Sequence, residues 1–283
     1  LRISALTERD TNRKGYEMGM EKITSTANPQ VRQLIQLQKK ARLRKEEDVF
    51  TVEGIKMYQE VPMDRLVHSY VSESFFQRQP ELFCGREKTT TLLSDREFES
   101  VSDTKTPQGI LCLVRQSHYT LTELMPKKEH GTLPLIMALE NLQDPGNLGT
   151  VLRTAEGAGV TGILLSSGCV DLYNPKVIRS TMGSIYRMPF FVADDFHAAI
   201  RELKGHGVRW YAAHLKGEDS YDRQDYRQPT GFLIGNESRG LSDETAELAD
   251  CYIRIPMCGR VESLNAAVAS AILMYEASRQ RHI

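Results

Sequence analysis

Several features that mark other classes of protein are missing from this chain of 283 residues. The five cysteines are scattered and include no C-x-x-C pair, so we expect no disulfide framework and no structural zinc site, and we place the protein in the reducing cytoplasm. No apolar run approaches the roughly 20 residues of a membrane-spanning helix. Neither sign of charge dominates, because 36 Lys and Arg face 37 Asp and Glu. The composition therefore predicts no membrane segment and gives no reason to expect a nucleic-acid partner.

The sequence signatures of several common enzymes are missing as well. No G-x-G-x-x-G follows the first strand of the regular part of the chain, and G-x-x-x-x-G-K-[ST] is not found. Neither Ser238 nor Ser263 lies in a G-x-S-x-G nucleophile elbow. The seven histidines show no metal-ligand spacing, so we expect no catalytic metal. These absences favour group transfer from a preactivated donor.

What is present is a chain of two parts. Residues 1–19 are polar without an apolar core, so we expect a flexible N-terminal extension rather than a secretory signal, with Met18 or Met20 as the candidate start. Residues 20–117 fit a small α/β domain, and residues 118–132 fit a linker. In residues 133–283 strands alternate with helices. This pattern predicts an α/β fold whose mostly parallel sheet binds ligands beyond the carboxyl ends of its strands.

The N-terminal domain begins with a strongly basic stretch. Residues 28–45, NPQVRQLIQLQKKARLRK, predict one amphipathic helix without a breaker. The stretch carries no acid and six basic residues: Arg32, Lys39, Lys40, Arg42, Arg44 and Lys45. Taken alone, such a run is more often a solvated helix face than a binding surface for phosphate.

The first of three unusual loops follows the first strand of the C-terminal domain. It reads NLQDPGNLGTVLRTA over residues 141–155 and leads into a helix that Asn147 is expected to cap. Arg153 then lies about one and a half turns into the helix. Arginine is suited to gripping a phosphate or carboxylate, although a capped turn with a surface arginine would explain the same pattern.

The other two loops also follow strands. In FLIGNESRGL, residues 232–241, the glycines let a ligand approach the backbone closely or simply form a turn. In IPMCGRVESLNAAVASAILMYE, residues 255–276, Ser263 is expected to cap a helix whose first turns are rich in alanine. Such small residues predict very close packing against this helix.

In this order, the three loops resemble the motifs of the SpoU/TrmH branch of the SPOUT methyltransferases. The matching residues are Asn141, Asp144, Pro145, Asn147, Gly149 and Arg153, then Gly235, Glu237, Gly240 and Leu241, then Ile255, Pro256, Met257, Ser263, Leu264, Asn265, Arg279 and Gln280. The N-terminal part is similar to the substrate-binding domain of rRNA-directed members. The resemblance implies a C-terminal segment threaded through a deep trefoil knot, preceded by a small α/β RNA-binding domain. It also implies a homodimer formed through the knotted domain.

The resemblance further implies a reaction and its residues. S-adenosylmethionine would be the cofactor, and a ribose 2′-hydroxyl of RNA would receive its methyl group. The catalytic residues would be Arg153, Asn147, Glu237, Ser263 and Asn265. The cofactor-binding residues would be Gly235, Ile255, Met257 and Leu264. The RNA-binding residues would be Arg32, Lys39, Lys40, Arg42 and Arg44, because with the resemblance the basic stretch favours phosphate binding.

Three other functions stay open at this point. The extra N-terminal domain favours large-subunit rRNA over tRNA as the substrate, yet a tRNA 2′-O-methyltransferase remains the first alternative. A non-catalytic RNA-binding or ribosome-assembly factor could keep the same fold. An ordinary dinucleotide enzyme is disfavoured by the missing glycine fingerprint.

Overall fold

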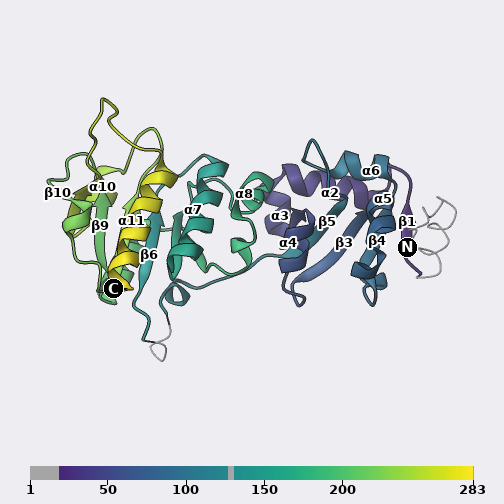
Figure 1. The fold of residues 1–283 in the computed structure, drawn as a ribbon, viewed down its shortest axis with the longest axis horizontal. Helices are drawn as coiled ribbons and strands as arrows, with labels where there is room; N and C mark the ends of the chain where they lie inside the picture. Colours follow the sequence, from purple (N-terminus) through teal and green to yellow (C-terminus); the bar gives the residue numbers. More distant parts are fainter. Residues whose placement is uncertain (1–18, 127–130, 283) are drawn as a thin grey trace, which may run out of the picture. The chain divides into compact units, whose positions relative to one another are not determined.

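The structure is a computed structural model that describes residues 19–126 and 131–282 (Figure 1). The chain forms two compact units. The first comprises Leu1–Gln116 with Tyr173–Pro175, and the second comprises Ser117–Leu172 with Lys176–Ile283. The expected N-terminal extension lies almost wholly outside the described residues. No helix in the described part of the chain is long and apolar enough to span a bilayer.

The first unit is built on a five-stranded mixed sheet of order β1-β4-β3-β5-β2. Strand β4 pairs in parallel with β1 and β3, whereas β5 pairs antiparallel with β3 and β2. Helix α2 packs its buried Val31, Leu34 and Leu37 into the core of this unit. These residues are three apart, so they lie on the same face of the helix. The strands are β1 Glu21–Ile23, β2 Val49–Glu53, β3 Leu66–Ser72, β4 Thr90–Leu93 and β5 Ile110–Arg115, and the helices are α2 Pro29–Lys39, α3 Ala41–Glu47, α4 Ile55–Glu60, α5 Glu73–Arg78 and α6 Asp95–Val101.

The basic stretch forms two helices, so the prediction of a single helix was wrong. Lys40 has extended backbone angles, φ −116° and ψ 106°, and separates α2 from α3. The Arg44 guanidinium reaches back to the end of α2 and donates to the carbonyl oxygens of Leu37 at 2.5 Å and Gln38 at 3.1 Å. These carbonyls have no intrahelical partner at a helix end, so the arginine replaces the bonds that a continuous helix would have made.

The second unit is built on a seven-stranded sheet of order β10-β12-β9-β11-β6-β7-β8, in which every neighbouring pair is parallel. The expected α/β fold with a mostly parallel sheet is confirmed. The strands are β6 Leu135–Leu139, β7 Gly162–Ser166, β8 Phe190–Ala193, β9 Arg209–Ala213, β10 Asp219–Ser220, β11 Thr230–Ile234 and β12 Cys251–Arg254, and the helices are α7 Pro145–Ala158, α8 Pro175–Thr181, α9 Phe196–Gly205, α10 Asp243–Ala246 and α11 Ala266–Arg281.

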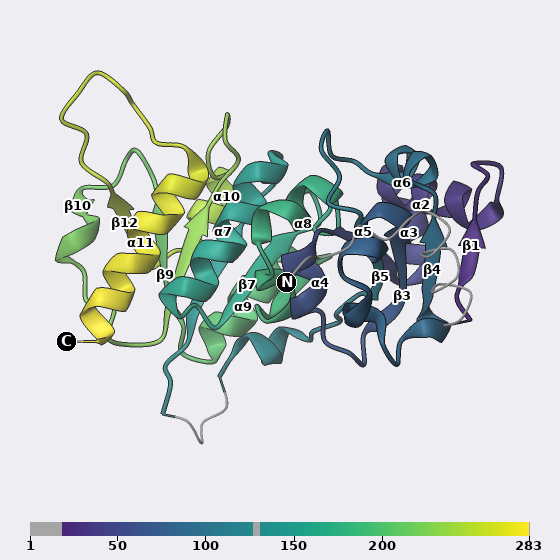
Figure 2. The same cartoon turned by 45° about the vertical axis from the view of Figure 1, so that its right-hand side comes forward.

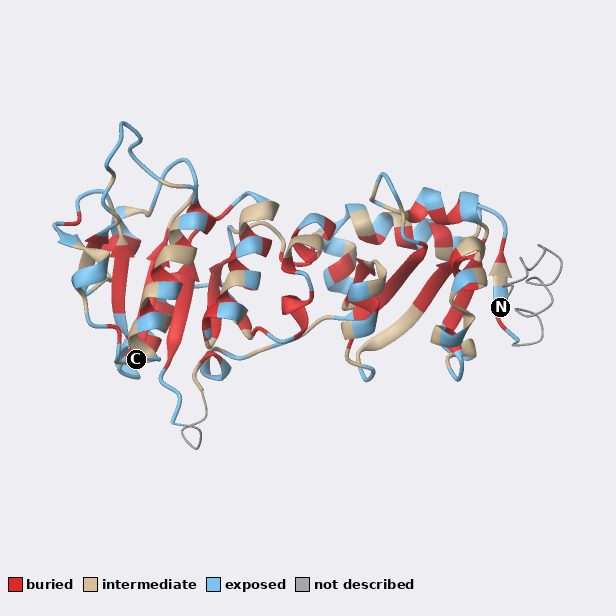
Figure 3. Cartoon of the chain, in the orientation of Figure 1, coloured by how far each residue is buried: buried red, intermediate tan, exposed pale blue. Residues whose placement is uncertain are grey.

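Helices cover this sheet, and the central strands are wholly buried (Figure 3). Helix α9 packs Ile200 and Leu203 against Ile136 and Ala138 of β6. Helices α7 and α11 lie side by side, as both ribbon views show (Figure 2). A parallel sheet buried on both faces reads as continuous apolar strands, which is the pattern of LIMAL in β6.

Part of the expected linker packs onto the second unit. Residues Leu121–Leu124 form a short 3-10 helix, capped by Thr120 and Glu123. Leu124 is fully buried in the core around Ile136. A side chain at Gly162 would lie only 2.7 Å from the Leu124 Cβ, so the segment is tightly fitted. Residues 127–130 lie outside the described part of the chain.

We predict that Arg44→Ala lowers the free energy of unfolding by about 1–3 kcal/mol, because two carbonyls at the end of α2 lose a charged donor. Arg42→Ala is the matched control. The Arg42 side chain is 90% exposed and, among its described contacts, bonds only the exposed Glu46 one turn later, so no measurable loss is expected. Denaturant unfolding of both variants tests this, and equal stability of the two would contradict the role assigned to Arg44.

Candidate active site

Three loops meet beyond the carboxyl ends of the parallel strands. They follow β6, β11 and β12, and β6 and β11 are direct neighbours in the sheet. From β6 the chain adds β7 and β8 on one side of the sheet, and it then adds β9 and β11 on the other side of β6. The strand order therefore switches at β6. Open parallel sheets bind ligands at such a switch in strand order. Two adjoining cavities are found there, and the Asn236–Leu241 segment lines both.

The loop after β6 enters helix α7 one turn earlier than expected. Asp144 is the N-cap, and its side chain accepts a hydrogen bond of 2.8 Å from the amide of Asn147. Pro145 occupies the first helical position, where its missing N–H is not needed. The prediction that Asn147 caps α7 was therefore wrong. Its side chain is released from capping and extends into the site instead.

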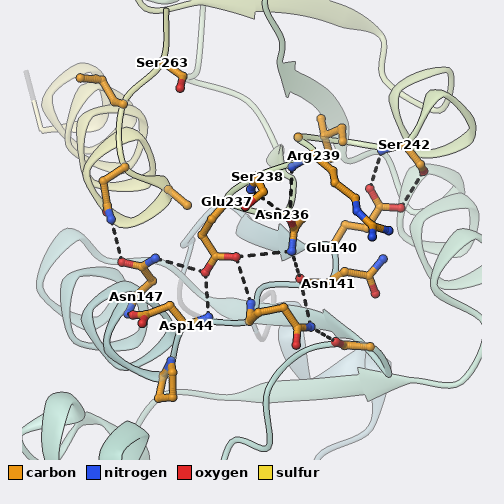
Figure 4. Close-up of a pocket in the computed structure, with 18 residues that line it drawn as sticks. Glu140, Asn141, Asp144, Asn147, Asn236, Glu237, Ser238, Arg239, Ser242 and Ser263 are labelled. Atoms are coloured by element: carbon orange, nitrogen blue, oxygen red, sulfur yellow. Dashed lines mark hydrogen bonds between the residues drawn. The ribbon is translucent and has the colours of Figure 1, made fainter. Parts of the chain in front are cut away.

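Glu237 is the centre of the hydrogen bonds in the first cavity (Figure 4). Its carboxylate accepts from the backbone amides of Gln143 at 3.0 Å and Asp144 at 2.9 Å, and from the side-chain amide of Asn147 at 3.1 Å. Partial burial raises the pKa of Glu237, but these donors outweigh it and hold the pKa below its ordinary value. Glu237 is thus a fixed anion that joins the loop after β11 to the start of α7.

Asn265 extends this connection to the third loop. It is the N-cap of α11, and its side-chain oxygen accepts from the amides of Ala267 and Val268. Its NH₂ group donates to the side-chain oxygen of Asn147 at 2.9 Å. The prediction that Ser263 caps this helix was wrong, since the helix begins two residues later. Ser263 is exposed and lines both cavities.

The loop after β11 is closed on itself. Asn236 and Gly240 exchange backbone hydrogen bonds of 3.0 and 2.9 Å, and Gly240 has φ +72°. A Cβ at Gly235 would lie 2.0 Å from the carbonyl carbon of Gly240 and 2.1 Å from the amide of Leu241. No side chain fits at Gly235, so the glycine is required by the close approach of the two backbone segments.

The second cavity brings together all four residues predicted to bind the cofactor. Gly235, Ile255, Met257 and Leu264 line it, and the cavity encloses about 380 Å³. Ala266 and Ala269 of α11 form part of its wall, which explains the alanines at the start of that helix. Its size and its mixture of apolar side chains with accessible backbone are typical of small-molecule sites.

Arg153 is the predicted catalytic residue that does not lie where the three loops meet. It is exposed on α7 and is not among the described residues that line either cavity. No hydrogen bond joins Arg153 to Glu237 among the described contacts, in which Glu237 bonds Asn147, Asn236 and two backbone amides. The role of Arg153 stays a prediction.

The five predicted RNA-binding residues divide into two groups. Four of them are exposed in the first unit, Arg32 and Lys39 on α2, Lys40 between the helices and Arg42 on α3, whereas Arg44 is 3% exposed. Because Arg44 is committed to the end of α2, it is removed from the candidate phosphate contacts. No group of three or more His, Cys, Asp or Glu side chains within residues 19–126 and 131–282 could hold a metal ion.

Sequence reasoning missed Glu140 and Gln143. Glu140 is only 6% exposed although it is an acid, and it follows directly on the buried strand β6. An acid placed against an uninterrupted apolar run signals a buried charge with dedicated partners. Gln143 contributes its backbone amide to Glu237, which no pattern of side chains could reveal.

The fold and these loops together define a methyltransferase-type α/β domain joined to a second, smaller unit. Residues 134–275 match the SpoU rRNA Methylase family, and residues 28–112 match the MRM3-like substrate binding domain. The chain belongs to the SpoU rRNA methylase family.

Two relatives illustrate the similarity in sequence. An uncharacterised tRNA/rRNA methyltransferase of Synechocystis sp. is 32% identical over 92% of this chain and 94% of its own length. The 23S rRNA (guanosine(2553)-2′-O)-methyltransferase RlmP of Bacillus subtilis is 34% identical over 65% of this chain and 70% of its own length.

Two solved structures have the same fold as this chain. An AdoMet-bound rRNA methyltransferase from Sinorhizobium meliloti superposes with a TM-score of 0.81 at 29% identity, over 92% of this chain and 98% of that one. An RNA 2′-O ribose methyltransferase superposes with a TM-score of 0.78 at 31% identity, over 93% of this chain and 100% of the other. The fold expected from the sequence is thus shared with methyltransferases along nearly the whole chain.

We predict that Asn265→Asp keeps the N-cap of α11 but removes the hydrogen bond from residue 265 to Asn147. Aspartate still caps α11 but cannot donate to Asn147, so two acceptor oxygens would face each other. Thermal stability should stay close to that of the wild type, while methyl transfer falls at least roughly tenfold for about 1.4 kcal/mol of lost positioning. Asp195→Asn is the control, because it exchanges the same two cap residues at α9, away from both cavities. Wild-type turnover in Asn265→Asp would show that the bridge is dispensable.

We also predict a pH dependence for Glu237. Since its folded-state pKa is lowered, the ionised carboxylate stabilises the fold above its ordinary pKa of about 4.3, and this stability is lost as the pH falls through the lower folded-state value. The difference in free energy of unfolding between wild type and Glu237→Gln should be constant from pH 6 to 8 and shrink in acid. A difference that does not change down to about pH 3 would refute this.

Proposed function

We propose that the protein transfers a methyl group from S-adenosylmethionine to a ribose 2′-hydroxyl of RNA, with large-subunit rRNA as the substrate. The observation that carries the proposal is the meeting of three loops after β6, β11 and β12, which form one cavity for a cofactor and an adjoining polar one. The relatives named for rRNA and the substrate-binding match in residues 28–112 support rRNA over tRNA.

The second cavity fits the cofactor. Gly235, Ile255, Met257 and Leu264 would hold it, because apolar walls suit an adenine ring and the closely approaching backbone at Gly235 offers amide and carbonyl groups. When bound, S-adenosylmethionine supplies a methyl group on a positively charged sulfur. Glu237 is exposed on the loop that lines both cavities, so its fixed negative charge also favours a cationic ligand nearby.

The residues of the first cavity would position the ribose. Methyl transfer is an in-line displacement, so much of the rate comes from holding the hydroxyl in the correct direction. Asn147 donates to Glu237 and accepts from Asn265, and these two bonds hold the surface in place. Ser263 lies exposed beside them and offers a hydroxyl to the nucleotide. Glu237 already accepts four described hydrogen bonds, so we assign it to positioning rather than proton abstraction.

Arg153 is proposed to stabilise the oxygen that attacks the methyl group, or the adjacent phosphate. A guanidinium keeps its charge in proteins and is a poor proton acceptor, whereas stabilising developing negative charge suits it.

The place of Arg153 on α7, beside α11, favours a homodimer with the reaction near the interface. Val268 and Tyr275 of α11 support such an interface, since they are 49% and 53% exposed. A trefoil knot and a cytoplasmic location stay predictions.

Methyl transfer can be measured directly with labelled S-adenosylmethionine and purified large-subunit rRNA, small-subunit rRNA and tRNA. We expect label in the large-subunit rRNA at a ribose 2′-oxygen. Label only in tRNA would establish the first alternative. Cofactor binding by calorimetry without transfer to any RNA would favour the non-catalytic assembly factor.

We predict that Arg153→Ala abolishes methyl transfer, by at least about 10²-fold, while S-adenosylmethionine still binds, because the residue lies outside the cofactor cavity. Arg201→Ala is the control, an exposed arginine on α9 that should leave turnover unchanged. Single-turnover rates and calorimetry on both variants separate chemistry from binding. Near-normal turnover of Arg153→Ala would remove this residue from the mechanism.

We predict that RNA binding depends on the exposed basic residues of α2 and α3. Replacing Lys39, Lys40 and Arg42 by Gln should weaken RNA binding and reduce the slope of log K against log salt by up to about 2–3, since each phosphate contact contributes about 0.7–0.9. Gln at the exposed Lys88 and Lys105 of the same unit is the control. An unchanged slope in the triple variant would place the RNA on another surface.

A further inference from the structure

One buried charge that lines the first cavity has no role in the proposed chemistry. Glu140 follows β6 and is only 6% exposed. Its Oε2 accepts from the backbone amide of Ser242 at 2.8 Å, and its Oε1 accepts from the Ser242 hydroxyl at 2.7 Å (Figure 4). The same Oε1 also accepts from the Thr245 hydroxyl at 2.6 Å. Burying a carboxylate costs free energy unless donors meet it, and here three do.

The backbone of the same residue makes a second connection. The amide of Glu140 donates to the carbonyl of Ile234, the last residue of β11, at 2.8 Å. Ile234 immediately precedes the closed loop of residues 235–241, and Ser242 immediately follows it. Glu140 therefore holds both ends of this loop, one with its main chain and the other with its side chain.

We propose that Glu140 is a positioning residue for the cofactor, which keeps loop 235–241 in its binding shape before the cofactor arrives. This rests on the proposed function. Glu140 itself is not among the residues that line the cofactor cavity, whereas every residue from Gly235 to Leu241 is. The effect of Glu140 on the cofactor must then pass through the loop.

Loss of the Glu140 contacts would lower the fraction of protein whose loop 235–241 has the shape that binds the cofactor. If the loop leaves its binding shape part of the time, the apparent Kd rises in inverse proportion to the remaining fraction, while the bound state stays as it was. Glu140→Gln keeps the shape of the side chain but replaces one acceptor oxygen by a donor that cannot serve Ser242 or Thr245 as the carboxylate does.

Calorimetry with S-adenosylmethionine and steady-state kinetics test the proposal on the full chain. For Glu140→Gln we expect the Kd for S-adenosylmethionine to rise about tenfold at full stoichiometry, while kcat at saturating cofactor stays within about threefold of the wild type. Ser242→Ala keeps the backbone bond to Glu140 and loses one donor, so its Kd should rise less, about threefold. This milder variant decides the matter if Glu140→Gln does not fold.

The chain offers a matched control in its first unit. Glu97 is also 6% exposed and bonds Ser94, the N-cap of α6, as Glu140 bonds Ser242, the N-cap of α10. Glu97→Gln should cost stability but leave the Kd unchanged. A Kd for Glu140→Gln within about twofold of the wild type, or fewer binding sites with an unchanged Kd, would reduce Glu140 to a fold-stabilising role and overturn the proposal. Failure of the wild type to bind S-adenosylmethionine would instead contradict the proposed function.

Discussion

The site depends on the hydrogen-bonded path that runs from the start of α11 through Asn265 and Asn147 to the carboxylate of Glu237. Each link joins two loops that are far apart in sequence, since Asn147 and Asn265 are separated by 118 residues and Asn147 and Glu237 by 90. The link from Asn147 to Glu237 is a hydrogen bond to a charged group, the stronger kind, whereas the link from Asn265 to Asn147 joins two neutral amides. Without this path, the loop after β12 would lose its hydrogen bond to the loop after β6, whereas the loops after β6 and β11 would keep the bonds between Glu140 and Ser242.

This path also explains why the polar residues are distributed as they are. Asp144 takes the capping role at α7, and this leaves the Asn147 side chain available to Glu237 and Asn265. Asn265 caps α11 with its oxygen and bridges with its nitrogen, so one amide performs two functions. Gly235 lets the loop fold back on itself, and Glu140 ties the two ends of that loop to β6. The proposed cofactor and ribose positions then share walls of the same rigid segment.

Much of this arrangement could be predicted from the sequence, because some of the signals are local. The alternation of strands and helices in residues 133–283 was predicted, since the apolar period of a segment such as the helix Phe196–Gly205 lies within the segment itself. The order of the three loops along the chain predicted the family. Parallel-strand topology then requires that loops at carboxyl ends lie on the same edge of the sheet.

Other features depend on contacts that no local pattern contains. The break at Lys40 follows from Arg44, which reaches two carbonyls of the preceding helix. Helix α7 begins at Pro145, three residues before the position expected from an Asn147 cap, because Asp144 caps the helix instead. Leu124 was assigned to a linker, yet tertiary packing buries it beside Ile136.

The most direct measurement of the central claim is a map of ribose 2′-O-methylation across total RNA from cells with and without this gene. The account predicts that one ribose methyl group in large-subunit rRNA is lost with the gene and returns when the wild-type gene is restored, but not with Arg153→Ala. No lost ribose methyl group in any RNA, or a lost one that Arg153→Ala restores as fully as the wild-type gene, would contradict it.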